Sequence, residues 1–438
     1  MTSNIKTQKG YIIKAFQQLN LHPLILTAIE DQGYPNPTKI QKKVIPLILK
    51  NTDVIAASKS GTGKTAAFVL PMLDKMHKIV KPDNHVLRGL IVVPTRELVD
   101  QISRNLSAYG KHLKIRHTKI QGGISKAVQL EKLATGIDII VATPGRLKDF
   151  IEEGVVDISS VNMIVLDEAD TMLELGFLEE IEYLISECSV NRQIMMFSAT
   201  ISQNIKKLAK EFLNNPVSIE VSNRRDVVAL IKHKAYKIDA KKKSDLLSYV
   251  IKTSPYAQIL VFVNTKEMAD ELNATLLSNK IKVATVHGDI VYQDRVKGIK
   301  DFRSKKIKVM IATDVAARGI DIKELPLVIN YELPETTDDF THRVGRTGRA
   351  NNHGEVITFL TTADYNRFTK IERHLRLSIK REVIEGFELK DRQPRQRQQV
   401  KKSLSEKKGL KKPRNNSQKV GAKSKKTTKR DVNRTFRK

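Results

Sequence analysis

The sequence has one cysteine, no tryptophan and no long hydrophobic run. A single cysteine, Cys188, excludes an intramolecular disulfide framework and fits a reducing, cytoplasmic compartment. Apolar residues just before it indicate an amphipathic helix, so we interpret Cys188 as a half-buried packing residue. No apolar stretch approaches the ~20 residues that span a bilayer. Residues 1–18 lack a signal-peptide pattern, and no Cys/His group has the spacing of zinc ligands.

Acidic residues are scarce relative to basic ones. The chain has 77 Lys and Arg against 48 Asp and Glu, a net charge of +29, which predicts a polyanionic partner. Residues 391–438 alone hold 19 Lys and Arg against three acids, with few large apolar side chains. We therefore expect residues 388–438 to be a disordered basic tail. The 438-residue length suits two domains besides that tail.

Three carboxylates end an apolar run at residues 161–170. Asp167, Glu168 and Asp170 would repel one another if buried without a counter-charge, so a cation is expected nearby. Acids at the carboxyl edge of a parallel sheet hold Mg²⁺ and position water in nucleotide hydrolases. The alternative is a solvated acidic turn after a strand.

A phosphate-binding loop is predicted at residues 58–65. A short strand at 53–57 precedes it, and a helix opens from it and continues through residue 73. Its glycines let backbone N–H groups turn toward phosphates, Lys64 reaches the terminal phosphates, and the Thr65 hydroxyl can bind Mg²⁺. Ser58 stands where the strict pattern has glycine. The residues assigned to ATP here are Ser60, Gly61, Thr62, Gly63, Lys64 and Thr65.

Two upstream residues are candidates for adenine recognition. A helix ended by Gly33 and a second helix over 40–49 flank a proline-containing turn. The amide of Gln41 can donate to and accept from one edge of adenine, and Phe16 can stack on the base. Both are equally compatible with ordinary helix packing.

Short apolar segments recur through the chain with helices between them. They lie at 89–93, 138–141, 162–166 and 192–197, and again at 258–263, 283–286, 308–312, 327–330 and 355–360. This βα pattern predicts two parallel sheets, the second without a phosphate loop. We expect an α/β protein with domains at 1–220 and 233–387, joined by a linker at 221–232.

Polar turns at three strand ends of the first half match a phosphodiester backbone. They combine hydroxyls, exposed amides and arginines at helix starts. Simple helix capping is the alternative for any one of them. The residues are Pro94, Thr95, Arg96, Gly122, Gly123, Thr143, Pro144, Gly145 and Arg146.

An arginine-rich segment lies at residues 342–349. Arginines three apart share a helix face, so Arg343, Arg346 and Arg349 are predicted to form one cationic stripe. One interpretation is an RNA-facing basic helix.

Taken together, the chain resembles the DEAD-box ATP-dependent RNA helicases from residue 16 to about residue 384. The signature is Asp167-Glu168-Ala169-Asp170. The resemblance implies two tandem RecA-like domains, with catalytic roles for Lys64, Asp167 and Glu168 and with Mg²⁺ held by Thr65 and Asp167. It assigns the adenine to Gln41 and Phe16 and the ribose to Asp321. It makes Arg346 and Arg349 arginine fingers on the γ-phosphate.

The resemblance also extends the RNA site and names coupling residues. It adds Arg295 and Thr313 to the RNA contacts, and Asp170, Ser198, Thr200, His342 and Arg343 to the groups that link hydrolysis to domain closure. One position departs from the family pattern: Tyr292 stands where a glutamine is usual. The role of that glutamine is therefore in doubt, whereas Arg295 can keep its phosphate contact.

The resemblance implies a monomeric RNA-dependent ATPase that unwinds short duplexes or remodels RNA–protein complexes. Compact bacterial members are linked to ribosome assembly, mRNA turnover and cold adaptation. There are two alternatives: an ATP-dependent RNA clamp that does not unwind duplexes, and a DNA-directed translocase. Basic clusters at 411–414 and 423–430 also match nuclear localisation signals.

Overall fold

The computed structural model describes residues 15–58, 61–79, 85–221, 231–317, 320, 325–348 and 354–389. Most of the expected linker, 222–230, and the basic tail from residue 390 lie outside these residues. So do three of the predicted site residues, Ser60, Asp321 and Arg349. Within the described ranges, every helix is too short or too polar to cross a lipid bilayer.

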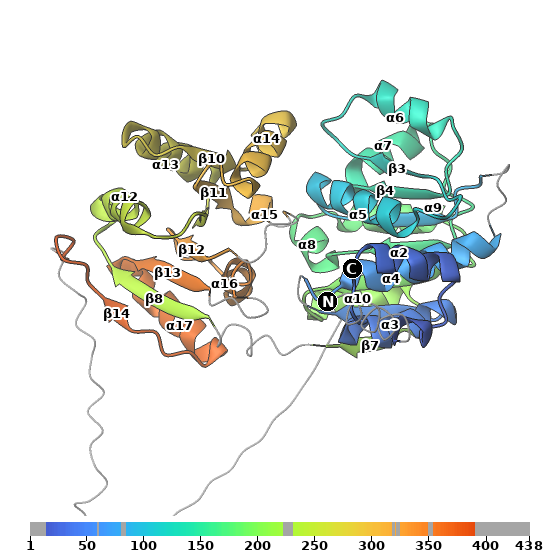
Figure 1. Cartoon of the computed structure of the whole chain (residues 1–438), viewed down its shortest axis with the longest axis horizontal. Coiled ribbons are helices and arrows are strands. Elements are labelled where there is room, and N and C mark those ends of the chain that lie inside the picture. The colour runs from blue at the N-terminus through green and yellow to red at the C-terminus, as the bar shows by residue number, and fades with distance from the viewer. Residues whose placement is uncertain are drawn as a thin grey trace, which may run out of the picture. The chain divides into compact units, whose positions relative to one another are not determined.

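The first half of the chain forms a seven-stranded parallel sheet in the order β3-β4-β2-β5-β6-β1-β7 (Figure 1). Its strands are β1 (Val54–Ala57), β2 (Gly89–Val92), β3 (His117–Ile120), β4 (Ile139–Ala142), β5 (Met163–Leu166), β6 (Gln193–Ser198) and β7 (Val217–Glu220). In the register of this sheet, Val54 of β1 lies opposite Met195 of β6 and Val217 of β7. All neighbouring pairs are parallel, so the strands' carboxyl ends share one edge.

Helices cover both faces of this sheet. They are α2 (Pro23–Asp31), α3 (Lys39–Leu49), α4 (Lys64–Ile79), α5 (Arg96–Tyr109), α6 (Lys126–Leu133), α7 (Pro144–Glu152), α8 (Ala169–Glu174), α9 (Leu178–Glu187) and α10 (Gln203–Phe212). Side chains alternate along a strand, so Val54 and Ala56 pack toward α2–α5 while Ile55 packs toward α7–α10. Both faces are buried, which is why the strands read as continuous apolar runs.

The second half forms another seven-stranded parallel sheet, in the order β10-β11-β9-β12-β13-β8-β14. Its strands are β8 (Lys232–Lys237), β9 (Ile259–Val263), β10 (Val283–Val286), β11 (Val309–Thr313), β12 (Leu327–Asn330), β13 (Glu355–Leu360) and β14 (Arg381–Glu382). Taken in chain order, each strand occupies the position of its counterpart in the first sheet, so β8 corresponds to β1 and β12 to β5.

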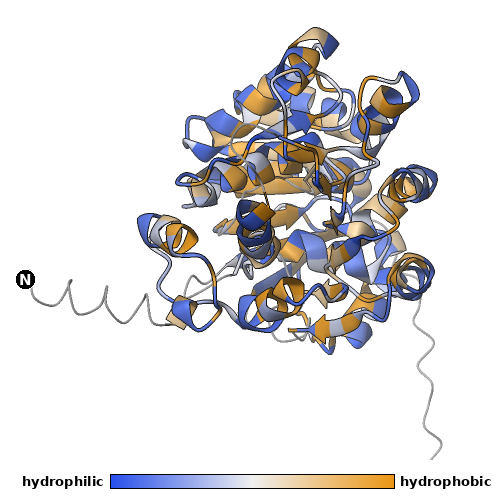
Figure 2. Cartoon of the chain, turned by 90° about the vertical axis from the view of Figure 1, so that its right-hand side faces the viewer, coloured by the Kyte–Doolittle hydropathy of each residue, from blue (hydrophilic) through white to orange (hydrophobic). Residues whose placement is uncertain are grey.

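Helices again cover both faces of the second sheet. They are α12 (Lys243–Thr253), α13 (Lys266–Ser278), α14 (Tyr292–Arg303), α15 (Asp314–Ala317), α16 (Thr337–Val344) and α17 (Tyr365–Leu375), with short 3₁₀ turns at η1 (Ala240–Lys242) and η2 (Thr362–Asp364). The α12 and α13 helices pack on one face and α14 to α17 on the other. In the first half, which faces the viewer in Figure 2, the strands are mostly hydrophobic, while the helices that cover them carry polar residues as well.

These two sheets confirm the predicted fold class of tandem RecA-like domains. The sequence patterns missed four strands, β3, β7, β8 and β14, because their sequences are polar. Of these, β3, β7 and β14 are edge strands, which need one buried face at most. The polar β8 (KHKAYK) pairs with β13 through six residues and starts at Lys232, the last residue of the range expected as a linker.

Candidate nucleotide and RNA site

The phosphate loop connects β1 to α4. Gly61 and Gly63 have φ values of +80° and +93°, which a residue with a side chain rarely adopts. A Cβ on Gly63 would lie 2.4 Å from the Gln41 side-chain nitrogen, so the space also requires glycine. Lys64, the first residue of α4, is buried, and its charge acts on both Asp167 and Glu168. The loop therefore brings an ammonium group to the carboxyl edge of the first sheet.

The Gln41 amide is held in one orientation beside this loop. Its Nε2 donates to the Gly63 carbonyl at 3.2 Å, and its Oε1 accepts from the Thr38 N–H at 2.9 Å. The Thr38 contact is half of a capping box at the start of α3. Gln41 thus ties α3 to the phosphate loop, in addition to any contact with a base.

The acidic turn follows β5 directly. Asp167 accepts from the Glu168 N–H at 3.0 Å, and Glu168 has a left-handed backbone with φ +53°. Such a conformation is uncommon for a non-glycine residue and is often found at functional sites. Burial raises the pKa of Glu168 to about 7, opposed by the charges of Lys64 and Arg346 and assisted by that of Asp167. Burial likewise raises the pKa of Asp167, against the opposing charge of Lys64.

A cavity of about 540 Å³ brings these groups together. Ligand sites typically range from about 300 to 1,000 Å³. The predicted site residues that line it are Gln41, Gly61, Gly63, Lys64, Thr65, Asp167, Glu168 and Arg346. The cavity therefore combines a phosphate loop, two carboxylates and an arginine from the second half of the chain.

The structure does not support Phe16 as the aromatic at this cavity. Phe16 is only 2% exposed and packs in the hydrophobic core between α2–α5 and the first sheet. Tyr34, which the sequence patterns did not single out, lines the cavity instead, and its hydroxyl lies 2.8 Å from that of Tyr109. The available signal was its position between Gly33 and Pro35, close to Gln41.

The predicted arginine stripe is also wrong. Helix α16 ends at Val344 and Gly345 caps it, so Arg346 does not continue the helical face of Arg343. Arg343 is buried and pairs with both oxygens of Asp314 at 2.6 Å. Arg346 lines the nucleotide cavity and donates to the Ile320 carbonyl at 2.9 Å. The turn after α16 thus sends neighbouring arginines to different surroundings, one to a buried ion pair and one to the cavity.

The predicted RNA residues of the first half lie at the carboxyl ends of three neighbouring strands, β3, β4 and β2. Thr95 and Thr143 are the N-cap residues of α5 and α7, and only the Thr95 hydroxyl caps its helix. Arg96 packs over the backbone of Gly123, where a Cβ would lie 2.4 Å from its guanidinium. Arg146 pairs with Asp149 at 3.5 Å. Helix capping therefore accounts for the hydroxyl of Thr95. The Thr143 hydroxyl makes no capping hydrogen bond, so it is available to a ligand. Pro94 and Gly122 lie in the turns after β2 and β3, and Pro144 and Gly145 are the first two residues of α7.

Arg295 and Tyr292 on α14 contact residues of α5. Arg295 pairs with Glu97 at 2.7 Å and donates to the Ala316 carbonyl at 3.0 Å. The Tyr292 hydroxyl donates to Asp100, and the Arg96 guanidinium lies 5.7 Å from its ring centre. Tyr292 therefore makes polar contacts at the position where the family usually has glutamine.

The predicted coupling residues connect the acidic turn to the end of β6. Asp170 accepts from the Ala199 N–H at 2.9 Å. Ser198 donates to the Thr200 carbonyl at 2.6 Å, and the Thr200 N–H donates back to the Ser198 hydroxyl. His342 lies on α16, half-buried, and Thr313 ends β11 and is buried. The acidic turn is thus hydrogen-bonded directly to the residues that follow β6.

Fold and site together define a tandem RecA-like protein that binds a nucleoside triphosphate. The profile of the DEAD/DEAH box helicase family matches residues 38–208, and that of the helicase conserved C-terminal domain matches residues 241–351. The chain is 37% identical to the DEAD-box ATP-dependent RNA helicase CshA of Geobacillus kaustophilus over 378 residues, which is 85% of this chain and 80% of that protein. The chain belongs to the DEAD-box ATP-dependent RNA helicase family.

Other relatives agree with this assignment. The chain is 37% identical to the ATP-dependent RNA helicase DeaD of Mycobacterium tuberculosis over 83% of its own length, but it spans only 64% of that protein. Among solved structures, S. cerevisiae Dbp5 bound to RNA and ADP BeF3 has a TM-score of 0.76 and 31% identity, covering 84% of this chain and 96% of that one.

Proposed function

We propose that this protein is an RNA-dependent ATPase that unwinds short RNA duplexes or remodels RNA–protein complexes. The observation that carries the proposal is the cavity lined jointly by Lys64, Glu168 and Arg346. The test is ATPase activity with and without RNA, together with displacement of a short RNA strand by the intact protein. Hydrolysis that RNA does not stimulate would contradict the proposal.

In this proposal, residues around the cavity bind the phosphates and the adenine of ATP. Lys64 and the N–H groups of the phosphate loop bind its phosphates, and Gln41 recognises the adenine. Tyr34, which lines the same cavity, supplies the aromatic face that was expected of Phe16. Lys64, as a fixed positive charge, also favours the charged forms of Asp167 and Glu168.

The oxygen ligands present suit Mg²⁺. Thr65 and Asp167 both line the cavity and offer a hydroxyl and a carboxylate. Within the described part of the chain, no group of three or more His, Cys, Asp or Glu side chains forms a metal site, which fits an ion that takes its other ligands from phosphate and water. Such an ion would neutralise charge on the phosphates. Glu168 orients or deprotonates the attacking water, and Arg346 stabilises the charge that develops on the transferred phosphate.

RNA is held through its backbone along the carboxyl ends of β3, β4 and β2 and at α14. Backbone contacts carry no base information, so we expect largely sequence-independent binding. Arg96 and Arg146 supply charge, and the Thr143 hydroxyl, which caps no helix, is free to donate to a phosphate. Arg295 and Thr313 extend the RNA contacts into the second half. At the nucleotide, by contrast, Arg349 acts as the second arginine finger on the γ-phosphate and Asp321 binds the ribose.

Two other functions give different results in the same assays. An ATP-dependent RNA clamp would hydrolyse ATP with RNA but would not displace a strand. A DNA-directed translocase would be stimulated equally by DNA of the same sequence, whereas contacts to the 2′-hydroxyl distinguish RNA.

We place the protein in the cytoplasm as a monomer acting on ribosomal or messenger RNA–protein complexes, with cold adaptation as a candidate role. Relatives named CshA and DeaD support a bacterial setting for such a role. Crosslinking the protein to cellular RNA and sequencing the bound fragments would identify its targets.

The pKa of Glu168 predicts a pH dependence of hydrolysis. A general base acts only when deprotonated, and burial raises the pKa of Glu168 to about 7. We therefore expect kcat/KM to fall about tenfold per pH unit below this value and to level off above it. ATPase rates at saturating RNA between about pH 5.5 and 8.5 measure the profile. The Glu168→Gln variant should lose this acid limb along with most activity, and an unchanged limb in that variant would contradict the assignment.

The basic tail predicts a salt dependence of RNA binding. Each Lys or Arg that pairs with a phosphate releases counterions and steepens the dependence of log affinity on log salt. Truncation after Lys390 removes the 19 basic residues of segment 391–438 and should weaken RNA binding most at low salt. RNA binding across a salt series measures the slope for both proteins. At saturating RNA, kcat should change little, and an unchanged slope would show that the tail does not hold RNA.

A further inference from the structure

The second sheet repeats not only the strand order of the first but also the position of a lysine. In the first sheet α4 follows β1 and begins at Lys64, and in the second α12 follows β8 and begins at Lys243. The two lysines are similarly buried, with exposed fractions of 8% and 9%. The resemblance between the halves therefore extends to the place where the first half binds phosphate.

Other groups around Lys243 also have counterparts in the first sheet. Glu332 is the second residue after β12, as Glu168 is the second residue after β5, and the charge of Glu332 acts on Lys243. A cavity of about 400 Å³ opens here, lined among others by Lys241, Lys243, Glu271, Tyr331 and Glu332. Ligands of open α/β sheets bind at the carboxyl ends of the strands, where this cavity lies.

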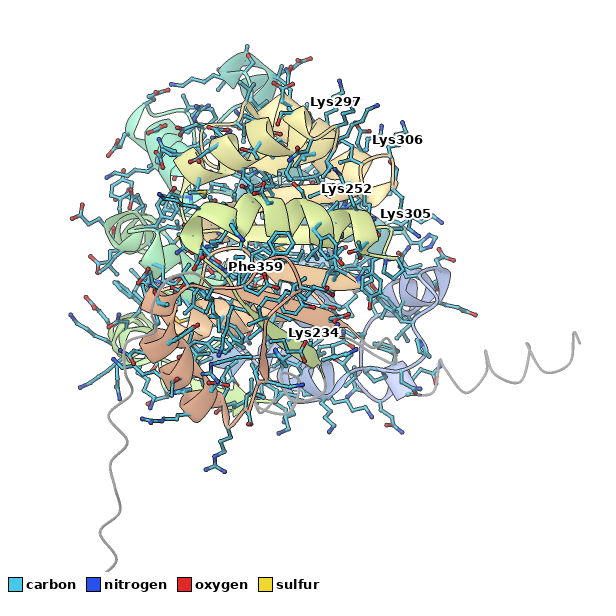
Figure 3. The ribbon with its side chains drawn as sticks, turned by 90° about the vertical axis from the view of Figure 1, so that its left-hand side faces the viewer. Lys234, Lys252, Lys297, Lys305, Lys306 and Phe359 are labelled. Atoms are coloured by element: carbon cyan, nitrogen blue, oxygen red, sulfur yellow. The ribbon has the colours of Figure 1, made fainter. Side chains whose placement is uncertain are left out.

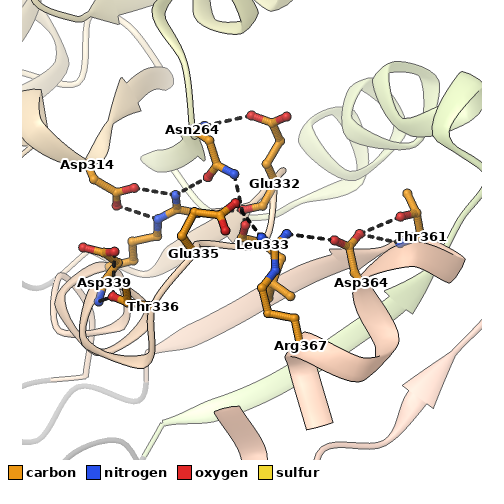
Figure 4. Close-up of polar contacts among 11 residues, drawn as sticks. Asn264, Asp314, Glu332, Leu333, Glu335, Thr336, Asp339, Thr361, Asp364 and Arg367 are labelled. Carbon is orange, nitrogen blue, oxygen red and sulfur yellow. Dashed lines mark hydrogen bonds and ion pairs between the residues drawn. The ribbon is translucent and has the colours of Figure 1, made fainter. Parts of the chain in front are cut away.

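Most polar groups at one side of this cavity already have partners (Figure 4). Asp364 accepts from the backbone and hydroxyl of Thr361 at 2.9 and 2.7 Å and pairs with Arg367 at 3.1 Å. Glu332 accepts from the Asn264 N–H at 2.7 Å through one of its two oxygens. These contacts fix the carboxylates in place and leave the second Glu332 oxygen to the cavity.

The Lys243 ammonium has no such partner. It lies 4.5 Å from the ring centre of Tyr331, and among the described residues it makes no hydrogen bond or ion pair. Burial lowers the pKa of Lys243, against the opposing charges of Glu332 and Asp364. A buried ammonium without an acceptor is costly, and an anionic ligand in the cavity would supply the missing acceptors.

The connection before α12 limits the size of that anion. Residues 238–242 contain no glycine, and Ala240–Lys242 form a 3₁₀ turn in which the Lys242 N–H donates to Asp239. The backbone therefore cannot cradle a triphosphate as the Gly61–Gly63 loop does. A single phosphate can be bound by Lys243, by Lys241 and by the start of α12. Additional phosphates would meet the carboxylates of Glu271 and Glu332, which instead suit the hydroxyls of a ribose.

We propose that the second sheet contains a non-hydrolytic binding site for a nucleoside monophosphate, with the phosphate on Lys243 and the ribose on Glu271 and Glu332. This site lies apart from the ATP cavity and goes beyond the proposed helicase activity. The same chemistry is offered by a free nucleotide and by the 5′-phosphorylated end of an RNA.

Titration calorimetry of the full-length protein tests the proposal. The ATP cavity is first saturated with Mg²⁺ and a non-hydrolysable ATP analogue, and AMP is then added. We expect one remaining binding event. Lys243→Met, which keeps the apolar stem over Tyr331, should weaken it about tenfold or more, the usual effect of losing a charge-assisted hydrogen bond.

Two matched variants separate this site from general effects of charge. Lys252→Ala removes an exposed charge from the same helix and should leave AMP binding unchanged (Figure 3). In the Lys64→Ala variant, AMP should still bind to the second site. Thermal unfolding checks that every variant is folded. Competition by an RNA with a 5′-phosphate, but not by one with a 5′-hydroxyl, would assign the site to RNA ends. No AMP binding by the wild type up to millimolar concentration, or unchanged binding in a folded Lys243→Met protein, would overturn the proposal.

Discussion

Replacing Arg346 by alanine is expected to lower kcat by about 10³- to 10⁵-fold, the usual value of an arginine finger, while ATP binding weakens far less. Arg346 lines the nucleotide cavity, and its charge acts on Glu168. A guanidinium there stabilises charge that develops only in the transition state, so its loss should appear in kcat rather than in KM. Steady-state ATPase kinetics at saturating RNA measure both quantities.

Two further variants show whether Arg346 acts through its geometry. Arg346→Lys keeps the charge but loses the planar fork and should recover only part of the rate. Arg373→Ala removes an exposed arginine from α17 and should leave kcat unchanged. If Arg346→Ala weakened only RNA binding, the interpretation of this segment as an RNA-facing basic element would be correct instead.

Replacing Lys64 by alanine is expected to abolish ATP turnover while the protein stays folded. Lys64 is buried at the start of α4, lines the cavity, and makes no hydrogen bond or ion pair to the described residues. Its ammonium therefore serves a ligand rather than the core. ATPase assays and thermal unfolding measure the two effects separately.

The control for this prediction is Lys43→Ala, which removes an exposed charge from α3 in the same domain and should retain full activity. Normal RNA-stimulated hydrolysis by the Lys64→Ala protein would contradict the prediction that this loop binds the phosphates of ATP.

Phe16 and Tyr34 illustrate a limit of sequence analysis. Both are aromatic residues upstream of Gln41, and a sequence pattern cannot say which ring faces a ligand. Packing decides: Phe16 fills the core beneath α2–α5, whereas Tyr34 lies at the cavity after a glycine with a φ of +68°. The arginines near residue 345 show the same limit, since the end of α16 at Val344 separates Arg343 from Arg346.

The two-sheet class, the phosphate loop and the acidic turn could be predicted from the sequence, because these features depend on short-range patterns. A buried parallel strand must be apolar along its whole length, and a loop that turns N–H groups toward phosphate requires glycine at fixed positions. Other distant groups meet in ways that only the folded chain shows, such as Tyr292 with Asp100 and Lys243 with Tyr331. These pairings depend on burial and on the order of strands in the sheets, and neither can be inferred from the sequence near each site.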